Sequence, residues 1–307
     1  MSEMDRDPPI VRDHRRQWRH CLYVYPVISR RAGGLSIGVN LNPDKRCNFA
    51  CLYCQIDRRT RRGLHEVKIE KIRSELAEAL SAATSGELWR EERFAATPQN
   101  LRRINDIAFS GDGEPTCLPE FDQTVAAAAD AKRQFGCDEA KIVVITNATQ
   151  LDSPQVRRAM PVLDASNGEI WAKLDAGSEA YFRRVNRPQP AMTLDRVTAN
   201  ILAVARGREV VIQTLLLRLG GSPPPGEEIA AYCDRLRSIL AAGGRIRLVQ
   251  LHTVARPPQD PLAARLGDAE LDAIAATVRK AVAPTPVETY YGQDVQSFRS
   301  DTGPSQS

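Results

Sequence analysis

Apolar residues along the chain follow two patterns, short continuous runs and longer segments with apolar positions three or four residues apart. Short runs rich in Val, Ile and Leu are typical of buried strands, whereas the longer spacing indicates amphipathic helices. Six strands are predicted, at residues 35–41, 106–109, 141–147, 169–175, 209–217 and 245–252. A further short strand is predicted at residues 286–291.

Helical patterns occupy the intervals between these runs. They predict helices at residues 67–80, 120–135, 179–184, 193–206, 227–241 and 268–282. Ser153 and Pro154 supply a further helix with an N-cap and a first-turn proline. The polar stretch 84–105 shows neither pattern and is expected to be an insertion or a long loop.

Strands that alternate with helices indicate a parallel sheet joined by right-handed crossovers. A closed α/β barrel needs eight such units, and the chain provides about six. The predicted fold class is therefore α/β, a partial (β/α)6 TIM-like barrel. A doubly wound, Rossmann-like sheet is the alternative.

The predicted strands are apolar through their middles and turn polar near their carboxyl ends. These polar residues are Ser110, Thr146, Asn147, Lys173, Asp175, Gln213, Thr214, Gln250 and His252. A parallel strand buried on both faces should be apolar throughout, and barrel enzymes carry their active sites at these strand ends. We therefore expect these side chains to line one mouth. Structural alternatives are a Lys173–Asp175 ion pair, loop hydrogen bonds from Gln213 and Thr214, and a hydrogen-bonded rim His252.

Three cysteines lie in one loop directly after the first predicted strand, spaced as Cys47-x3-Cys51-x2-Cys54. Thiolates gathered this closely favour a soft metal. Structural zinc sites and ferredoxin-type clusters both take four protein ligands. Three thiolates on a cubane cluster leave one iron open to an amine and a carboxylate. The alternatives are a thioredoxin-like Cys51–Cys54 pair and a zinc site completed by His65.

A glycine-rich turn, Ser-Gly-Asp-Gly-Glu-Pro-Thr at residues 110–116, follows the second predicted strand. Gly111 and Gly113 allow close approach of the backbone to a ligand, and Pro115 fixes the exit of the chain. Such a turn presents carbonyl groups that accept hydrogen bonds from an ammonium group. The simpler interpretation is a tight turn between a strand and a helix.

The cysteine spacing, with Tyr53 before the last cysteine, resembles the cluster motif of the radical S-adenosylmethionine (radical SAM) superfamily. The turn at residues 110–116 resembles that superfamily's Gly-Gly-Glu-Pro motif. The resemblance implies a partial barrel of the radical SAM type and a [4Fe–4S] cluster bound by Cys47, Cys51 and Cys54. It also implies reductive cleavage of S-adenosylmethionine to a 5′-deoxyadenosyl radical that abstracts hydrogen from a substrate. The candidate cofactor-binding residues are Tyr53, Gly111, Gly113, Glu114, Asn147, Lys173, Gln213 and His252.

Four phrases narrow the resemblance to the iron–sulfur oxidoreductase branch related to wyosine-forming tRNA enzymes. They lie at residues 110–116, 173–177, 185–188 and 249–257. This branch implies RNA, in particular tRNA, as substrate, and a reductant such as ferredoxin or flavodoxin. Alternatives are a protein or glycyl-radical partner activated by this chain, a small metabolite, or a non-catalytic Cys3His zinc-binding module.

Composition agrees with a folded globular protein. Of 307 residues, 42% are hydrophobic and 26% charged, close to globular averages. We expect a basic N-terminal extension at 1–34, a core domain with a C-terminal helix at 35–299 and a tail at 300–307. No membrane span or signal peptide is predicted. Seven cysteines, three of them clustered, do not form a disulfide framework, so the expected location is a reducing cytoplasm. The other cysteines are expected to act as small hydrophobic residues: Cys21, Cys117, Cys137 and Cys233.

The net charge of +4 is modest, but the basic residues are clustered. One group lies near the start of the chain: Arg12, His14, Arg15, Arg16, Arg19 and His20. Another follows the cysteine loop: Arg58, Arg59, Arg61 and Arg62. Such groups suit phosphate contacts, although a solvated basic face is the simpler interpretation.

Overall fold

The computed structural model describes residues 16–29, 31–58, 63, 66–256 and 258–292. The chain divides into two compact units. The first comprises residues 1–48 and 58–172, and the second comprises residues 49–57 and 173–307. Some residues of the basic groups, the possible zinc ligand and the tail lie outside the described part: Arg12, His14, Arg15, Arg59, Arg61, Arg62, His65 and 300–307.

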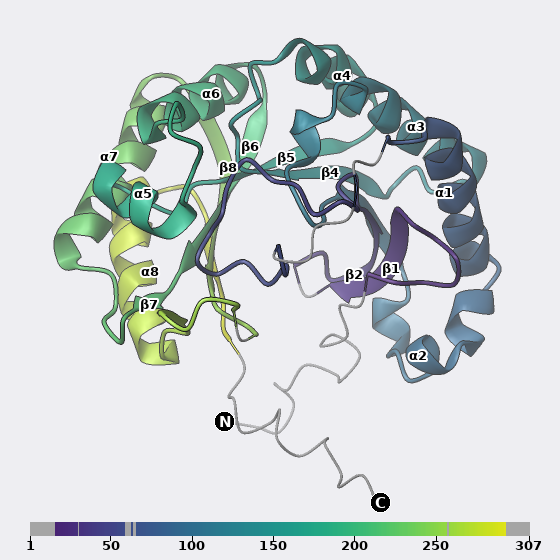
Figure 1. The fold of residues 1–307 in the computed structure, drawn as a ribbon, viewed down its shortest axis with the longest axis horizontal. Helices are drawn as coiled ribbons and strands as arrows, with labels where there is room; N and C mark the ends of the chain where they lie inside the picture. The colour runs from purple at the N-terminus through teal and green to yellow at the C-terminus, as the bar shows by residue number, and fades with distance from the viewer. Residues whose placement is uncertain (1–15, 30, 59–62, 64–65, 257, 293–307) are drawn as a thin grey trace, which may run out of the picture. The chain divides into compact units, whose positions relative to one another are not determined.

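The first unit is built on five adjacent strands (Figure 1). In sheet order they are β1 (Val24–Ser29), β2 (Gly34–Val39), β3 (Ile104–Phe109), β4 (Lys141–Thr146) and β5 (Gly168–Lys173). β1 runs antiparallel to β2, whereas the β2–β3, β3–β4 and β4–β5 pairs are parallel. The parallel register brings the carboxyl ends of β2, β3 and β4 to one edge, where segments 40–48, 110–116 and 147–149 begin.

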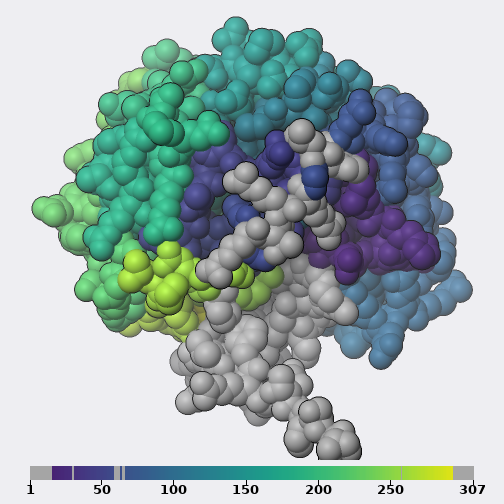
Figure 2. All heavy atoms as spheres, viewed as in Figure 1, coloured from purple at the N-terminus to yellow at the C-terminus, as the bar shows by residue number. Residues whose placement is uncertain are grey.

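Helices cover the strands of this unit, and each helix buries its apolar face against them. They are α1 (Ile69–Thr84), α3 (Phe121–Gln134) and α4 (Pro154–Ala165). On α1, Ile72, Leu76 and Leu80 recur every four residues and are fully buried. The stretch that lacked a pattern forms η3 (Glu87–Arg90), α2 (Glu92–Ala95) and η4 (Gln99–Leu101). α2 lies at the periphery of the unit, below α1 in Figures 1 and 2.

A buried carboxylate on α1 anchors the chain that enters β1. Glu75, 5% exposed, accepts hydrogen bonds from the backbone N–H groups of Leu22, Tyr23 and Val24 at 2.8, 2.7 and 3.0 Å. Arg19 continues the attachment by ion pairs to three further carboxylates, those of Glu78, Glu87 and Glu91. The segment before β1 is therefore held on α1 and on the residues just after it by charge-assisted hydrogen bonds.

The second unit contains three parallel strands, β6 (Glu209–Leu216), β8 (Arg245–Thr253) and β10 (Val287–Tyr290). Its helices are α5 (Glu179–Asn186), α6 (Leu194–Gly207), α7 (Gly226–Ala241) and α8 (Asp268–Val282). A small antiparallel pair joins β7 (Arg218–Leu219) to β9 (Ala263–Ala264). Register places Gln213 opposite Gln250 and Leu215 opposite His252, so the polar ends of β6 and β8 coincide.

The predicted elements agree with the observed ones within a few residues, apart from three strands, the short helices of the stretch 84–105 and the short helix η5 (Pro115–Cys117). The missed strands are β1, β7 and β9, and β1 falls within the residues predicted to be an N-terminal extension. None of the helices in the described part of the chain has the length and apolar character needed to cross a bilayer.

Candidate functional site

In the first unit, the glycine-rich turn after β3 packs against the segment that leads to Cys47. A Cβ atom at Gly111 would overlap the side chain of Asn40, and one at Gly113 would overlap the carbonyl oxygen of Arg46. Glycine is therefore required at both positions by close approach of two backbone segments. The turn is thus fitted to the chain directly before the first cysteine.

Asp112, the residue between the two glycines, fastens this contact. Its Oδ2 accepts a hydrogen bond from Asn40 Nδ2 at 3.0 Å, and its N–H donates to Asn40 Oδ1 at 3.0 Å. Its other carboxylate oxygen pairs with the Arg16 guanidinium. Arg16 therefore attaches the described part of the chain before β1 to the glycine-rich turn.

Glu114 is a buried carboxylate, 3% exposed, that ties this turn to the end of β4. Its Oε1 accepts from the hydroxyls of Thr116 and Thr146 at 2.5 and 2.6 Å, and its Oε2 accepts from the Asn147 N–H at 2.7 Å. Burial raises the pKa of Glu114, and the hydrogen bonds from Asn147 and the threonines oppose that rise. Its side chain therefore fixes the rim at the carboxyl ends of β3 and β4.

An amide chain links the end of β4 to the residue after Cys47. Asn147 Nδ2 donates to Asn48 Oδ1 at 2.7 Å, and Asn48 Nδ2 donates to Thr149 Oγ1 at 2.7 Å. The Thr149 hydroxyl returns to Asn147 Oδ1 at 2.7 Å. Cys47 Sγ lies 3.9 Å from Asn48 Oδ1 and is half-buried. The Asn48 side chain thus contacts both Asn147 and the thiol of the first cysteine.

In the second unit, the loop that carries Cys51 and Cys54 pairs with the chain after α5. Phe49 forms an antiparallel bridge with Pro188. The Ala50 N–H donates to the Arg187 carbonyl at 3.1 Å, and the Leu52 N–H donates to the Val185 carbonyl at 2.8 Å. These bonds hold the backbone on both sides of Cys51.

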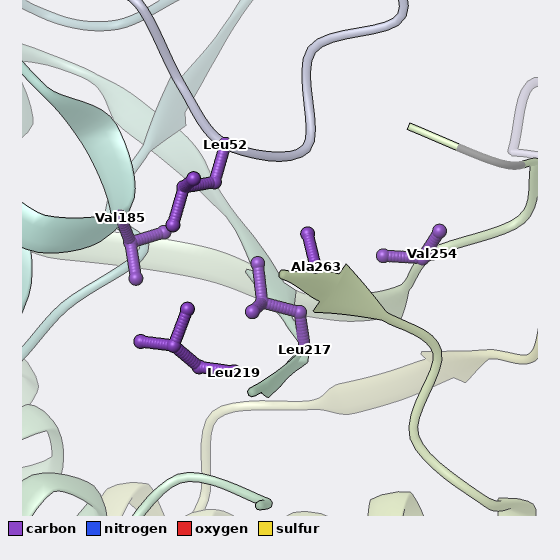
Figure 3. Packing of buried hydrophobic residues seen from close by; sticks show 6 residues of the cluster. All are labelled: Leu52, Val185, Leu217, Leu219, Val254 and Ala263. Atoms are coloured by element: carbon purple, nitrogen blue, oxygen red, sulfur yellow. The ribbon is translucent and has the colours of Figure 1, made fainter. Parts of the chain in front are cut away.

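Apolar packing reinforces this attachment, because Leu52 projects from the loop into a buried cluster (Figure 3). The cluster consists of Leu52, Val185, Leu217, Leu219, Val254 and Ala263. Leu52 is 2% exposed, although it lies on an irregular loop between two half-buried cysteines. Its burial fixes the short turn in which the Cys54 N–H donates to the Cys51 carbonyl at 3.0 Å.

A buried polar network surrounds Cys51. Asp175, whose side chain is 0% exposed, lies 3.5 Å from Lys173 Nζ and accepts from the Leu215 N–H at 2.8 Å and from the Tyr53 hydroxyl. The Lys173 ammonium also lies 4.9 Å from the centre of the Tyr53 ring. Burial, together with the charges of Asp175 and Cys51, raises the pKa of Tyr53 well above its ordinary value. The phenol is therefore a proton donor to Asp175 at neutral pH.

Asn186, at the end of α5, completes this network. Its Nδ2 lies 2.7 Å from Asp175 Oδ2, 3.4 Å from the Tyr53 hydroxyl and 3.7 Å from Cys51 Sγ. In the sequence, Asn186 stood out only as part of the phrase 185–188, with no role of its own. The structure brings it to a cysteine 135 residues earlier in the chain.

The remaining rim residues of this unit lie on β6 and β8. Gln213 Nε2 donates to Gln250 Oε1 at 3.1 Å, and the Thr214 hydroxyl contacts the Leu174 carbonyl and the Tyr232 hydroxyl at 2.9 and 2.6 Å. His252 stacks on Tyr290 with ring centres 4.7 Å apart. Gln213 thus joins neighbouring strand ends, while Thr214 fixes the start of the loop after β5.

The cysteine loop offers three half-buried thiols within eight residues of chain, a donor set that suits iron and other thiophilic metals. Cys47 belongs to the first unit and Cys51 and Cys54 to the second. Across the described residues, no three His, Cys, Asp or Glu side chains are grouped as ligands for a metal ion. The fit to a cluster therefore depends on the chemistry and spacing of the thiols and on the N–H donor beside Cys51.

No protein-family model matches the chain. A UPF0026 protein of Methanocaldococcus jannaschii is 26% identical over 235 residues, a match that covers 76% of this chain. The chain spans 64% of the length of that relative.

Two solved structures show the fold. A radical SAM methyltransferase from Sphaerobacter thermophilus matches with a TM-score of 0.60 and 15% identity, covering 89% of this chain and 70% of that chain. Streptococcus suis SuiB bound to S-adenosylmethionine matches with a TM-score of 0.54 and 14% identity, covering 86% of this chain and 52% of that chain. These matches confirm the predicted resemblance in fold and the predicted class, an α/β partial barrel of the radical SAM type.

Proposed function

We propose that this chain, which has the fold of radical SAM enzymes, is itself a radical SAM enzyme. The observation that carries the proposal is the Cys47-x3-Cys51-x2-Cys54 loop on such a fold, followed by the glycine-rich turn packed against its first end. When bound, a [4Fe–4S] cluster and S-adenosylmethionine supply a 5′-deoxyadenosyl radical that abstracts hydrogen from a substrate.

The chain's own residues would divide the work of binding. Cys47, Cys51 and Cys54 are the proposed iron ligands. In the first unit, the turn held by Glu114 presents the backbone around Gly111 and Gly113 to the cofactor's ammonium group. The hydrogen bonds of Asp112 and Glu114 support this role, because an acceptor that is already held in place loses little entropy on binding.

In the second unit, Tyr53, Lys173, Gln213 and His252 are the proposed cofactor contacts. Lys173 already pairs with Asp175 and lies over the Tyr53 ring. A cofactor carboxylate would compete with Asp175 for this ammonium group. Gln213 is held by Gln250, which leaves its side chain in a defined orientation.

The decisive experiment is anaerobic reconstitution of the full chain with iron and sulfide, followed by incubation with a reductant and labelled S-adenosylmethionine. We expect a brown protein, an EPR signal that changes on addition of the sulfonium compound, and formation of 5′-deoxyadenosine. Cys47→Ala should abolish all three. Cys233→Ala, at a buried cysteine of α7, is the matched control and should retain them.

Two results would contradict the proposal. Stoichiometric zinc in native preparations, without iron, favours the zinc-binding module. A Cys47→Ala variant that keeps every activity measured for the unsubstituted protein favours a thiol redox enzyme that uses Cys51 and Cys54. The metal content and the test of Cys47 together separate all three hypotheses.

We further propose an RNA base as the substrate class, supported by the resemblance of the four phrases to the wyosine-related branch. The described arginines of the N-terminal group support it less, since Arg16 pairs with Asp112 and Arg19 with three glutamates. Binding of tRNA should be measured against salt concentration, because phosphate contacts release counterions and weaken steeply with salt. Absence of binding at low ionic strength would exclude this substrate class and redirect the search to a peptide or small metabolite.

A further inference from the structure

Asn186 is an almost completely buried amide, 2% exposed, that lies between Asp175 and Cys51. Its amide nitrogen is within reach of three acceptors, Asp175 Oδ2, the Tyr53 oxygen and Cys51 Sγ. Within the described part of the chain, its Oδ1 has no hydrogen-bond partner. A buried amide in this arrangement directs its donors, rather than its acceptor, toward the cysteine.

The orientation of this amide is determined by Asp175. A carboxylate only accepts hydrogen bonds, so the NH2 end of Asn186 must face it. Rotating the amide by 180° would place two oxygens in contact at 2.7 Å, the present distance between Asn186 Nδ2 and Asp175 Oδ2. Asp175 is held in turn by the Leu215 N–H, the Lys173 ammonium and the Tyr53 hydroxyl. The donor end of Asn186 is therefore fixed.

One of the two N–H groups of Asn186 serves Asp175, and the other is left for Tyr53 and Cys51. The Tyr53 hydroxyl donates its proton to Asp175, so only its lone pairs face Asn186. A thiol is a weak acceptor, but a thiolate attracts an N–H donor strongly because the bond is charge-assisted. The Nδ2–Sγ distance of 3.7 Å places this N–H within hydrogen-bond reach of the sulfur that would bind iron.

The backbone also holds donor and acceptor in place. The Ala50 N–H, on one side of Cys51, donates to the Arg187 carbonyl, and the Leu52 N–H, on the other, donates to the Val185 carbonyl. Asn186 lies between Val185 and Arg187, so the same antiparallel contact that fixes Cys51 also fixes Asn186. The backbone contact thus fixes the two Cα positions, Asp175 orients the amide, and Nδ2 lies 3.7 Å from Sγ.

We propose that Asn186 is a positioning residue for the Cys51 thiolate, and that its N–H···S hydrogen bond raises the reduction potential of the cluster. This inference rests on the proposed radical SAM function. Hydrogen bonds to cluster sulfurs withdraw negative charge and stabilise the reduced state, and they are among the main determinants of cluster potential. Loss of the bond should therefore make the cluster harder to reduce.

The test is an EPR-monitored redox titration of the reconstituted full chain carrying Asn186→Leu, which removes both donors and keeps the branched shape of the side chain. We expect a lower midpoint potential than in the unsubstituted protein. Asn200→Leu makes the same change at another buried asparagine, on α6, and should leave the potential unchanged. Equal potentials in the Asn186→Leu and unsubstituted proteins, with intact clusters, would overturn the inference.

A second variant covers the case in which Asn186→Leu does not fold. Asn186→Asp is nearly isosteric, and two carboxyl groups this close share one proton, which keeps the net charge of the pair and leaves no donor for sulfur. The same lowering of the potential is expected, and an unchanged potential overturns the inference. An unsubstituted protein that binds no cluster would instead refute the proposed function, so the two failures are distinguishable.

Discussion

Replacing Asp106 by Asn should change how the stability of the protein depends on pH. Asp106 lies on β3, is 4% exposed and accepts a hydrogen bond from the Ser36 hydroxyl. It lines a cavity of about 420 Å³ in the first unit, together with Arg31, Lys141 and Trp171. Burial raises the pKa of Asp106 from 3.8 to about 6, although Ser36 and Arg31 oppose the rise.

The magnitude follows from this difference in pKa between the unfolded and folded states. Each pKa unit corresponds to about 1.4 kcal/mol, so a rise of about two units corresponds to about 3 kcal/mol. Because the folded state has the higher pKa, this stabilising contribution is complete below pH 3.8 and is lost as the pH rises through about 6. At pH values above about 7 the buried carboxylate is charged and costs the folded protein that amount. An amide at this position keeps an oxygen for Ser36 and carries no charge.

The assay is urea unfolding of the unsubstituted protein and the Asp106→Asn variant at several pH values between about 4 and 7.5. We expect the free energy of unfolding of the variant to gain about 3 kcal/mol relative to the unsubstituted protein across this range. Asp138→Asn, at an exposed residue between α3 and β4, controls for the change in net charge. A difference between Asp106→Asn and the unsubstituted protein that stays constant with pH would refute the reasoning.

Three further substitutions test the attachments of the cysteine loop and of the segment before β1. Leu52→Ala should lower the free energy of unfolding by about 3 kcal/mol, because it leaves a cavity beneath the cysteine loop, and should speed amide exchange in that loop. Leu262→Ala, at an exposed leucine, should have little effect. Equal effects of the two substitutions would contradict the role of the buried cluster. Glu75→Gln should lower the free energy of unfolding by about 2 kcal/mol in urea, because one of its N–H partners loses a charged acceptor; an unchanged midpoint would contradict the anchoring of the segment before β1. Arg187→Ala should lower the free energy of unfolding by less than about 1 kcal/mol, since solvent screens its partly exposed ion pair with Asp260. A larger loss in the same urea assay would show that solvent does not screen this pair.

The fold was predictable because its main elements carry local signals. Continuous apolar runs marked β4 and β6, and helical spacing marked α1, within a few residues of the observed bounds. β1 was missed because it is an antiparallel edge strand with a proline in its middle, Pro26, and no following helix to suggest a repeat unit. β7 was missed because two residues leave no periodicity to detect.

The candidate site was predictable only where chemistry is concentrated in a short stretch. The loop of Cys47 and the turn of Gly111 each stand out in the sequence by composition and spacing. The residues that contact these segments do not stand out in the sequence. Asn48 contacts Asn147, 99 residues later in the chain, and Cys51 contacts Asn186, 135 residues later. An isolated asparagine has no pattern that reveals its partner, so such contacts require the folded chain. The role of Asp112 likewise emerged only from its bonds to Asn40 and Arg16.

The pairing of the cysteine loop with the chain after α5 also has a consequence for biosynthesis. Leu52 hydrogen-bonds to Val185, which is translated 133 residues later. At a ribosomal rate of about 5–20 residues per second, Cys51 and Cys54 wait about 7 to 27 seconds without their partner segment. During that interval the nascent thiols are open to oxidation or to capture of a stray metal. If the proposed cluster is present, iron and sulfide delivered before residues 185–188 have emerged from the ribosome would meet a loop that lacks its partner segment. Assembly of that cluster would then belong late in synthesis or after release.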